Sequence, residues 1–121
     1  MTYCRPAINI GDIVLCEVTY TDYSSSKIRP VLIISTRDYD LGADDIIIAA
    51  VTSQIDPASP YKLILDDADP AFTDTGLKRK SAVDCTKILT ISYTLLARRL
   101  GRLSTDQLNS VHTILRTVLD L

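Results

Sequence analysis

Short runs of β-branched and aliphatic residues, separated by turn-forming residues, are the feature that most limits how this chain can fold. The clearest runs are Val31–Ser35, directly after Pro30, and Ile46–Thr52. Continuous runs of this length are typical of buried strands, and a proline at the start of a strand is tolerated because its missing N–H can face outward. Asp12–Tyr20 instead alternates between two faces, which predicts another strand.

Weaker strand patterns fill the middle of the chain. Tyr61–Leu65 alternates as a short strand, and Ser81–Ile91 has the composition of one or two more. Candidates for burial in the second segment are Val83, Cys85 and Ile88. Polar or acidic composition predicts loops at Thr21–Lys27, Asp38–Asp45 (where a short helical turn is an alternative) and Asp66–Thr75.

The end of the chain follows a helical pattern instead. Ser104 and Gln107 have the spacing of a capping box, in which each side chain bonds the other residue's backbone N–H. Apolar residues then recur at helical spacing, which predicts an amphipathic helix over residues 105–120. Five or six strands and one terminal helix predict a mainly β fold, a small and mostly antiparallel barrel with a helix packed on it. The 121 residues suffice for a single domain, 1–121.

Charge is concentrated in one part of the chain, although the net charge is only −2. Residues 37–74 carry nine acidic and two basic side chains, whereas residues 75–102 carry seven basic side chains and one acidic residue, Asp84. This basic segment runs from Lys78-Arg79-Lys80 to Arg102. A patch of this kind can bind phosphate whatever the overall charge, although a solvated face opposite the acidic loop is an alternative.

Most familiar catalytic sets are missing. The chain has three cysteines, an odd number, and none of them has C-x-x-C spacing: Cys4, Cys16 and Cys85. Such a set argues against a disulfide framework and is typical of proteins from a reducing compartment. His112, the only histidine, falls on the predicted helix, and no glycine-rich phosphate loop exists. The aspartates near Asp66 can bind a hard cation only loosely, and a solvated acidic loop is the simpler reading. We therefore expect no metal and no cofactor.

The sequence also predicts where the protein acts. Residues 1–6 lack the apolar core of a signal peptide, and no apolar stretch approaches the roughly 18 residues that cross a bilayer. We expect a cytoplasmic protein that does not enter a membrane.

Polar side chains gather where two predicted central strands begin and end. Arg29 precedes one strand, and Thr52 ends the next. If these strands pair antiparallel, both residues come to the same end of the sheet. A surface salt bridge for Arg29 and turn capping by Thr52 are the alternatives, and spacing alone leaves the function open.

Six blocks of sequence, in order, resemble one family. They are Gly11–Leu15, Thr21–Ser35, Ala50–Gln54, Gly76–Val83, Lys87–Ile91 and Leu100–Ser104. Together with the final helix they resemble the MazF/PemK-type toxin ribonucleases over nearly the whole chain. The resemblance implies an SH3-like barrel of five to seven mostly antiparallel strands with a C-terminal helix. It also implies a homodimer and a sequence-selective RNA endonuclease that a partner antitoxin neutralises.

The resemblance also assigns roles to residues. It implies that Arg29 and Thr52 form the catalytic pair. RNA contacts are implied for the loop before the arginine and, by looser analogy, for residues near the strand ends, and the basic segment adds three cations. The full set is Ser24, Ser25, Ser26, Lys27, Ser53, Gln54, Lys78, Arg79, Lys80 and Ser81. Ser25 stands where the family usually has glycine, which bears on the loop conformation and the RNA specificity.

The chemistry suits the residues available. In RNA the 2′-hydroxyl can attack the adjacent phosphorus, leaving a 2′,3′-cyclic phosphate and a 5′-hydroxyl, so no metal-bound water is needed. Arg29 offers a planar fork of donors for the phosphoryl oxygens, and Thr52 offers one hydroxyl hydrogen bond. Two other readings stay open: a toxin of the same fold that acts on a protein such as DNA gyrase, and an inactive family member that only binds its antitoxin.

Overall fold

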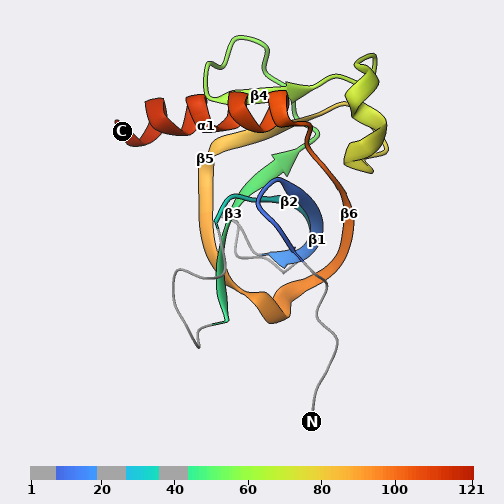
Figure 1. Cartoon of the computed structure of the whole chain (residues 1–121), viewed down its shortest axis with the longest axis vertical. Coiled ribbons are helices and arrows are strands. Elements are labelled where there is room, and N and C mark those ends of the chain that lie inside the picture. Colours follow the sequence, from blue (N-terminus) through green and yellow to red (C-terminus); the bar gives the residue numbers. More distant parts are fainter. Residues whose placement is uncertain (1–7, 19–26, 36–43) are drawn as a thin grey trace.

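The computed structural model describes residues 8–18, 27–35 and 44–121, which form one antiparallel sheet with the strand order β4-β5-β3-β2-β1-β6. The sheet curls strongly, and the terminal helix lies across β4 and β5 (Figure 1). The elements are β1 (Asp12–Val18), β2 (Lys27–Ile33), β3 (Asp45–Thr52), β4 (Lys62–Leu65), the 3-10 helix η2 (Pro70–Thr75), β5 (Ser81–Ser92), the 3-10 helix η3 (Tyr93–Leu95), β6 (Leu96–Arg102) and α1 (Thr105–Leu119). The predicted mainly β architecture with a C-terminal helix is confirmed.

Both faces of the curled sheet are buried, which is why the central strands are apolar throughout. One core, under α1 and η2, includes Ile13, Leu32 and Val111. The other includes Val14, Val31 and Tyr93. The alternation predicted for β1 therefore separates two cores rather than a core from solvent.

The terminal helix begins as the sequence predicts. The Gln107 N–H donates to Ser104 Oγ over 3.1 Å, and the Ser104 N–H donates to Gln107 Oε1 over 2.8 Å, so both bonds of the capping box form. The helix ends at Leu119, and Asp120 takes a left-handed conformation.

Several predicted boundaries were wrong. The segment Asp66–Thr75 is not all loop, because Asp69 caps η2 by accepting the Ala71 N–H and Pro70 fits its first turn. The segment Ser81–Ile91, predicted as one or two strands, is part of a single strand that a bulge bends. Ile88 is only half-buried, whereas Val83 and Cys85 are fully buried. The loop and strand ends predicted at residues 19–26 and 36–43, and Cys4, lie outside the described residues.

Strand β6 was not predicted from its pattern. Its sequence holds three arginines and a glycine and shows no clean alternation. Among the described strands it lies at the edge of the sheet and pairs only with β1, and edge strands tolerate charged side chains.

The backbone of β2 forms hydrogen bonds with β1 and with β3 at alternate residues. The Gly11 N–H donates to the Ile33 carbonyl over 2.9 Å, and the Ile34 N–H donates to the Ile47 carbonyl over 3.1 Å. Backbone groups of successive strand residues point to opposite sides. The odd-numbered residues of β2 therefore face β1, and the even-numbered ones face β3.

Pro30 ends the ladder between β2 and β3. It is an even-numbered residue, so its missing N–H lies on the β3 side, and the last paired residues are Val31 and Ala50. Pro30 stands inside β2 rather than at its start, which corrects the strand boundary predicted at Val31. Because the two strands stop pairing here, Arg29 and Thr52, which the same register would place opposite each other two residues further on, are not cross-strand partners.

An ion pair joins the start of β1 to β6. The Asp12 carboxylate, only 1% exposed, accepts the Asn9 N–H over 2.9 Å and lies 3.2 Å from Arg99 Nε. A buried carboxylate is costly without such partners, so this contact helps to hold β6 on the sheet.

Replacing Pro30 by alanine supplies the donor that the ladder lacks. We expect the amide of residue 30 to bond the Val51 carbonyl and to exchange slowly with solvent, as a strand amide does. Hydrogen exchange measured by NMR checks this. Exchange at the rate of an open loop would contradict the role given to the proline.

Replacing Arg99 by alanine leaves the buried Asp12 carboxylate without its cation. We expect the free energy of unfolding to fall by about 1–3 kcal/mol, less than for a fully buried pair because Arg99 is partly exposed. Urea denaturation measures this. Arg98→Ala, at the next residue of the same strand, is the matched control and should unfold as the wild type does.

Candidate active site

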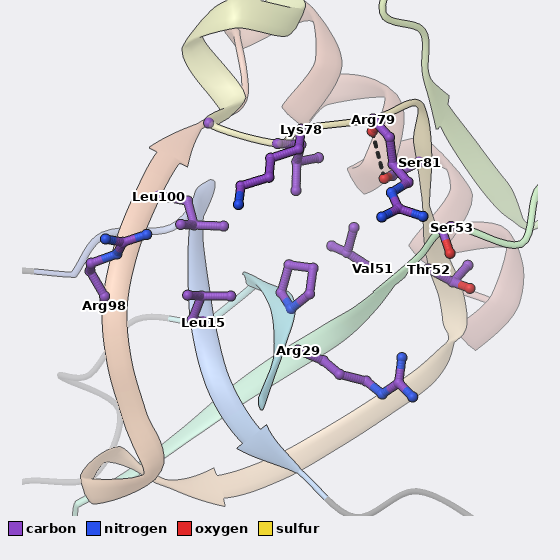
Figure 2. Close-up of a pocket in the computed structure, with 13 residues that line it drawn as sticks. Leu15, Arg29, Val51, Thr52, Ser53, Lys78, Arg79, Ser81, Arg98 and Leu100 are labelled. Atoms are coloured by element: carbon purple, nitrogen blue, oxygen red, sulfur yellow. Dashed lines mark hydrogen bonds between the residues drawn. The ribbon is translucent and has the colours of Figure 1, made fainter. Parts of the chain in front are cut away.

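A pocket of about 350 Å³ opens where β2 and β3 separate. Residues from β1, β2, β3, β5, β6 and the segment after η2 line it (Figure 2). The full lining is Leu15, Arg29, Pro30, Val51, Thr52, Ser53, Gly76, Leu77, Lys78, Arg79, Ser81, Arg98 and Leu100. The structure thus brings Arg29 and Thr52 to one pocket, as their positions at the strand ends suggested.

The pocket is strongly cationic. Four basic side chains line it, Arg29, Lys78, Arg79 and Arg98, and all four residues are exposed. Among the described residues, no acidic side chain lines the pocket and no carboxylate forms an ion pair with any of the four. Unpaired cations around one hollow favour an anionic ligand with several charges.

The floor between these cations is apolar. Leu15 is the cross-strand partner of Pro30 on one side and of Arg98 on the other. Cross-strand partners lie on one face of a sheet, so these residues form a row across β2, β1 and β6. Leu100 and Val51 complete the apolar part (Figure 2).

Thr52 is oriented by the backbone that follows it. Its Oγ1 accepts the Gln54 N–H over 3.0 Å, a bond that fixes the rotamer and leaves the hydroxyl proton free to donate. The Arg29 side chain extends toward the side of the pocket where Thr52 and Ser53 lie (Figure 2). A planar cation and a free hydroxyl donor therefore face one space.

Two glycines fix the position of the segment after η2, which carries Lys78 and Arg79. Gly76 has a φ of +72°, and a Cβ there would overlap the Leu100 carbonyl. A Cβ at Gly101 would likewise overlap the Asp74 carbonyl. The end of η2 thus packs backbone to backbone on β6, which brings the next residues to the pocket.

Ser81 ends this segment. Its side chain is buried and donates to the Arg79 carbonyl over 2.9 Å (Figure 2). The hydroxyl therefore holds the turn that presents the Arg79 side chain.

Some predicted RNA-binding residues lie elsewhere. Lys27, Gln54 and Lys80 do not line the pocket, and Lys80 Nζ lies 3.9 Å from the Asp66 carboxylate. Ser24, Ser25 and Ser26 lie outside the described residues. Sequence reasoning missed Arg98 as a site residue: it belongs to the basic segment, but only the pairing of β6 with β1 places it at the pocket.

Other reactive groups are occupied or buried. Burial raises the pKa of the Cys16 and Cys85 thiols to about 11, so both stay protonated at neutral pH and are poor nucleophiles. Asp66 and Asp69 accept backbone N–H groups of their own turns, and the Ala68 N–H lowers the pKa of Asp66. Across residues 8–18, 27–35 and 44–121, no three metal-ligating side chains gather at one point.

No helix in the described part of the chain has the length and apolar character needed to cross a bilayer.

Comparisons of the sequence and of the structure with known proteins agree on one family. Residues 9–119 match the family described as PemK-like, MazF-like toxins of type II toxin–antitoxin systems. The chain is 37% identical over 98 residues to endoribonuclease MazF2 of Mycobacterium bovis and to endoribonuclease MazF6 of Mycobacterium tuberculosis, covering 79% of this chain and 82% of each relative.

Solved structures show the same fold. The Mycobacterium tuberculosis toxin MazF-mt6 superposes with a TM-score of 0.72 at 23% identity, over 91% of this chain and 97% of that one. A mycobacterial endoribonuclease solved with its cognate antitoxin gives 0.73 at 22% identity, over 95% and 97%. The fold and family predicted from the sequence are therefore confirmed, and the chain belongs to the PemK-like, MazF-like toxin family of type II toxin–antitoxin systems.

Proposed function

We propose that this chain is a sequence-selective endoribonuclease that cleaves single-stranded RNA in the cytoplasm without a metal ion. The observation that carries the proposal is the pocket in which Arg29 and Thr52 lie with three further cations over an apolar floor, and no described carboxylate pairs with these cations. RNA supplies the matching chemistry, since each nucleotide combines a charged phosphate with an apolar base face. The endoribonuclease relatives support the same assignment.

The reaction is a transesterification within the RNA. The 2′-hydroxyl oxygen attacks the adjacent phosphorus, a new O–P bond forms, and the bond to the 5′-oxygen breaks. The products are a 2′,3′-cyclic phosphate and a 5′-hydroxyl end. The proton lost by the 2′-hydroxyl balances the one gained by the leaving oxygen.

Arg29 and Thr52 stabilise the charge that grows on the phosphoryl oxygens. The guanidinium of Arg29 presents parallel N–H donors, and an arginine stays protonated at any physiological pH, so its main role is electrostatic. The Thr52 hydroxyl, held by the Gln54 N–H, donates one more bond. Lys78 and Arg79 hold the RNA backbone.

An antitoxin and a second copy of the chain are the proposed protein partners. A relative of the same fold was solved with its cognate antitoxin, which supports an antitoxin here. Antitoxins of this kind are expected to be acidic and partly disordered, and the basic segment offers a complementary surface. The homodimer rests on the family resemblance.

Action on DNA gyrase is the second candidate function, and an inactive antitoxin-binding member is the third. In this pocket Arg29 can bind a phosphate, and the Thr52 hydroxyl is free to donate a hydrogen bond. A toxin that binds gyrase needs no such pair. The pocket therefore favours the ribonuclease.

Cleavage in the presence of a chelator tests the proposal directly. We expect the purified protein to cut single-stranded RNA in EDTA and to leave 2′,3′-cyclic phosphate and 5′-hydroxyl ends, which end-labelling detects. An oligonucleotide of the same sequence with 2′-deoxyriboses should resist cleavage because it lacks the 2′-hydroxyl nucleophile. A strict requirement for a divalent cation, or 5′-phosphate ends, would refute the mechanism.

Substitution of the proposed pair should lower the rate without unfolding the protein. We expect Arg29→Ala to lower kcat by about 10²–10³-fold, as for loss of a transition-state donor. Thr52→Ala should cost about 10–100-fold, since one hydrogen bond to a charged group is lost. Thr52→Ser is the matched control that keeps the hydroxyl and should retain most activity. Equal losses in the serine and alanine variants would contradict the role of the hydroxyl.

A further inference from the structure

Two neighbouring arginines of β6 have different surroundings. Arg99 pairs with the buried carboxylate of Asp12 at 3.2 Å, so its charge is used within the fold. Arg98 lines the pocket, is exposed, and pairs with no carboxylate among the described residues. Strand alternation sends the two side chains to opposite faces, which explains how adjacent residues come to differ. A cation that the fold does not neutralise is available to a ligand.

The row of cross-strand partners gives the distance between Arg98 and the β2 side of the pocket. Pro30, Leu15 and Arg98 are partners on three neighbouring strands. Since strands are spaced about 4.8 Å apart, the backbone of Arg98 lies roughly 10 Å from that of Pro30. Arg29 adjoins Pro30, so Arg29 and Arg98 stand at opposite sides of the pocket. One phosphate held by Arg29 and Thr52 leaves Arg98 to another group.

The surface between the two arginines suits a nucleoside. Leu15 and Leu100 are only half-buried, although they are large aliphatic side chains on the same wall as Arg98 (Figure 2). The Lys78 side chain extends toward Leu100 and adds a second cation there (Figure 2). Aliphatic contact and phosphate contact both tolerate any base, so this wall adds affinity without reading sequence.

We propose that Arg98, Leu15 and Leu100 form a second nucleotide subsite, in which Arg98 binds a backbone phosphate other than the scissile one. The sugar and base of that nucleotide lie on the two leucines. The identity of the ligand as RNA rests on the proposed function. Binding of a nucleotide at Arg98, Leu15 and Leu100 does not require that the chain cuts RNA.

Binding of an uncleavable oligonucleotide tests the subsite separately from cleavage. The probe is a fluorescein-labelled, mixed-sequence oligonucleotide with 2′-O-methyl riboses, which cannot attack their own phosphates, and the readout is anisotropy over a range of salt. We expect Arg98→Ala to weaken binding about tenfold, as for a lost charged hydrogen bond. The slope of log affinity against log salt should fall in magnitude by about 0.7, the contribution of one phosphate contact.

Two further variants separate the effect of charge from that of position. Arg102→Ala removes the same charge from an exposed residue of β6 that does not line this pocket, and it should leave binding and slope unchanged. Leu15→Ala should weaken binding several-fold with an unchanged slope, because only apolar contact is lost. Thermal unfolding of each variant shows that a loss of binding is not a loss of fold.

The outcomes distinguish the two proposals. If the wild type binds the oligonucleotide in an Arg98-dependent way but cuts no RNA in EDTA, the proposed function fails and the subsite stands. If the wild type cuts RNA but Arg98→Ala binds with unchanged affinity and slope, the subsite is overturned. Equal losses in Arg98→Ala and Arg102→Ala would also overturn it, since the effect would then be general attraction.

Discussion

The missing N–H of Pro30 is the constraint on which the site depends. Every other residue of β2 can donate to one neighbour or the other, and the ladder with β3 holds as far as Val31 and Ala50. At Pro30 the donor on the β3 side is absent, and the two strands separate. The gap leaves Arg29 and Thr52 facing a shared space instead of each other's backbone. One covalent feature of the sequence thus gives both the end of the β2–β3 pairing and the beginning of the site.

Burial on both faces makes this opening possible without loss of the fold. The core under α1 and η2 and the core inside the curl hold β1, β2 and β3 from opposite sides. The sheet therefore does not need hydrogen bonds between β2 and β3 beyond Val31, where β2 still pairs with β1 and β3 with β5. The same division appears on β6, where Arg99 fastens the strand to Asp12 and Arg98 is left for the pocket.

The elements whose local chemistry was complete could be predicted from the sequence. The capping box at Ser104 and the apolar run Ile46–Thr52 each carry their own signal, and both form as expected. The edge strand β6 carries none, since its place in the sheet comes from pairing with β1, many residues away in the chain. The antiparallel pairing of two central strands was enough to bring Arg29 and Thr52 together. The position of Arg98 at the pocket could not be predicted in this way, because it depends on where β6 lies.

The backbone contacts of Gly76 and Gly101 also bear on how such a toxin can diversify. These contacts, with the bond from Ser81 to the Arg79 carbonyl, fix both ends of the short segment between Gly76 and Ser81. Between the anchors, Leu77 packs against the core under α1 and η2, whereas Lys78, Arg79 and Lys80 are exposed and belong to neither core. The side chains of Lys78 and Arg79 can change with little cost to the fold, while their positions at the pocket stay the same. In the proposed ribonuclease, single substitutions in this segment would therefore change the side chains that meet the RNA while the backbone that carries them stays in place.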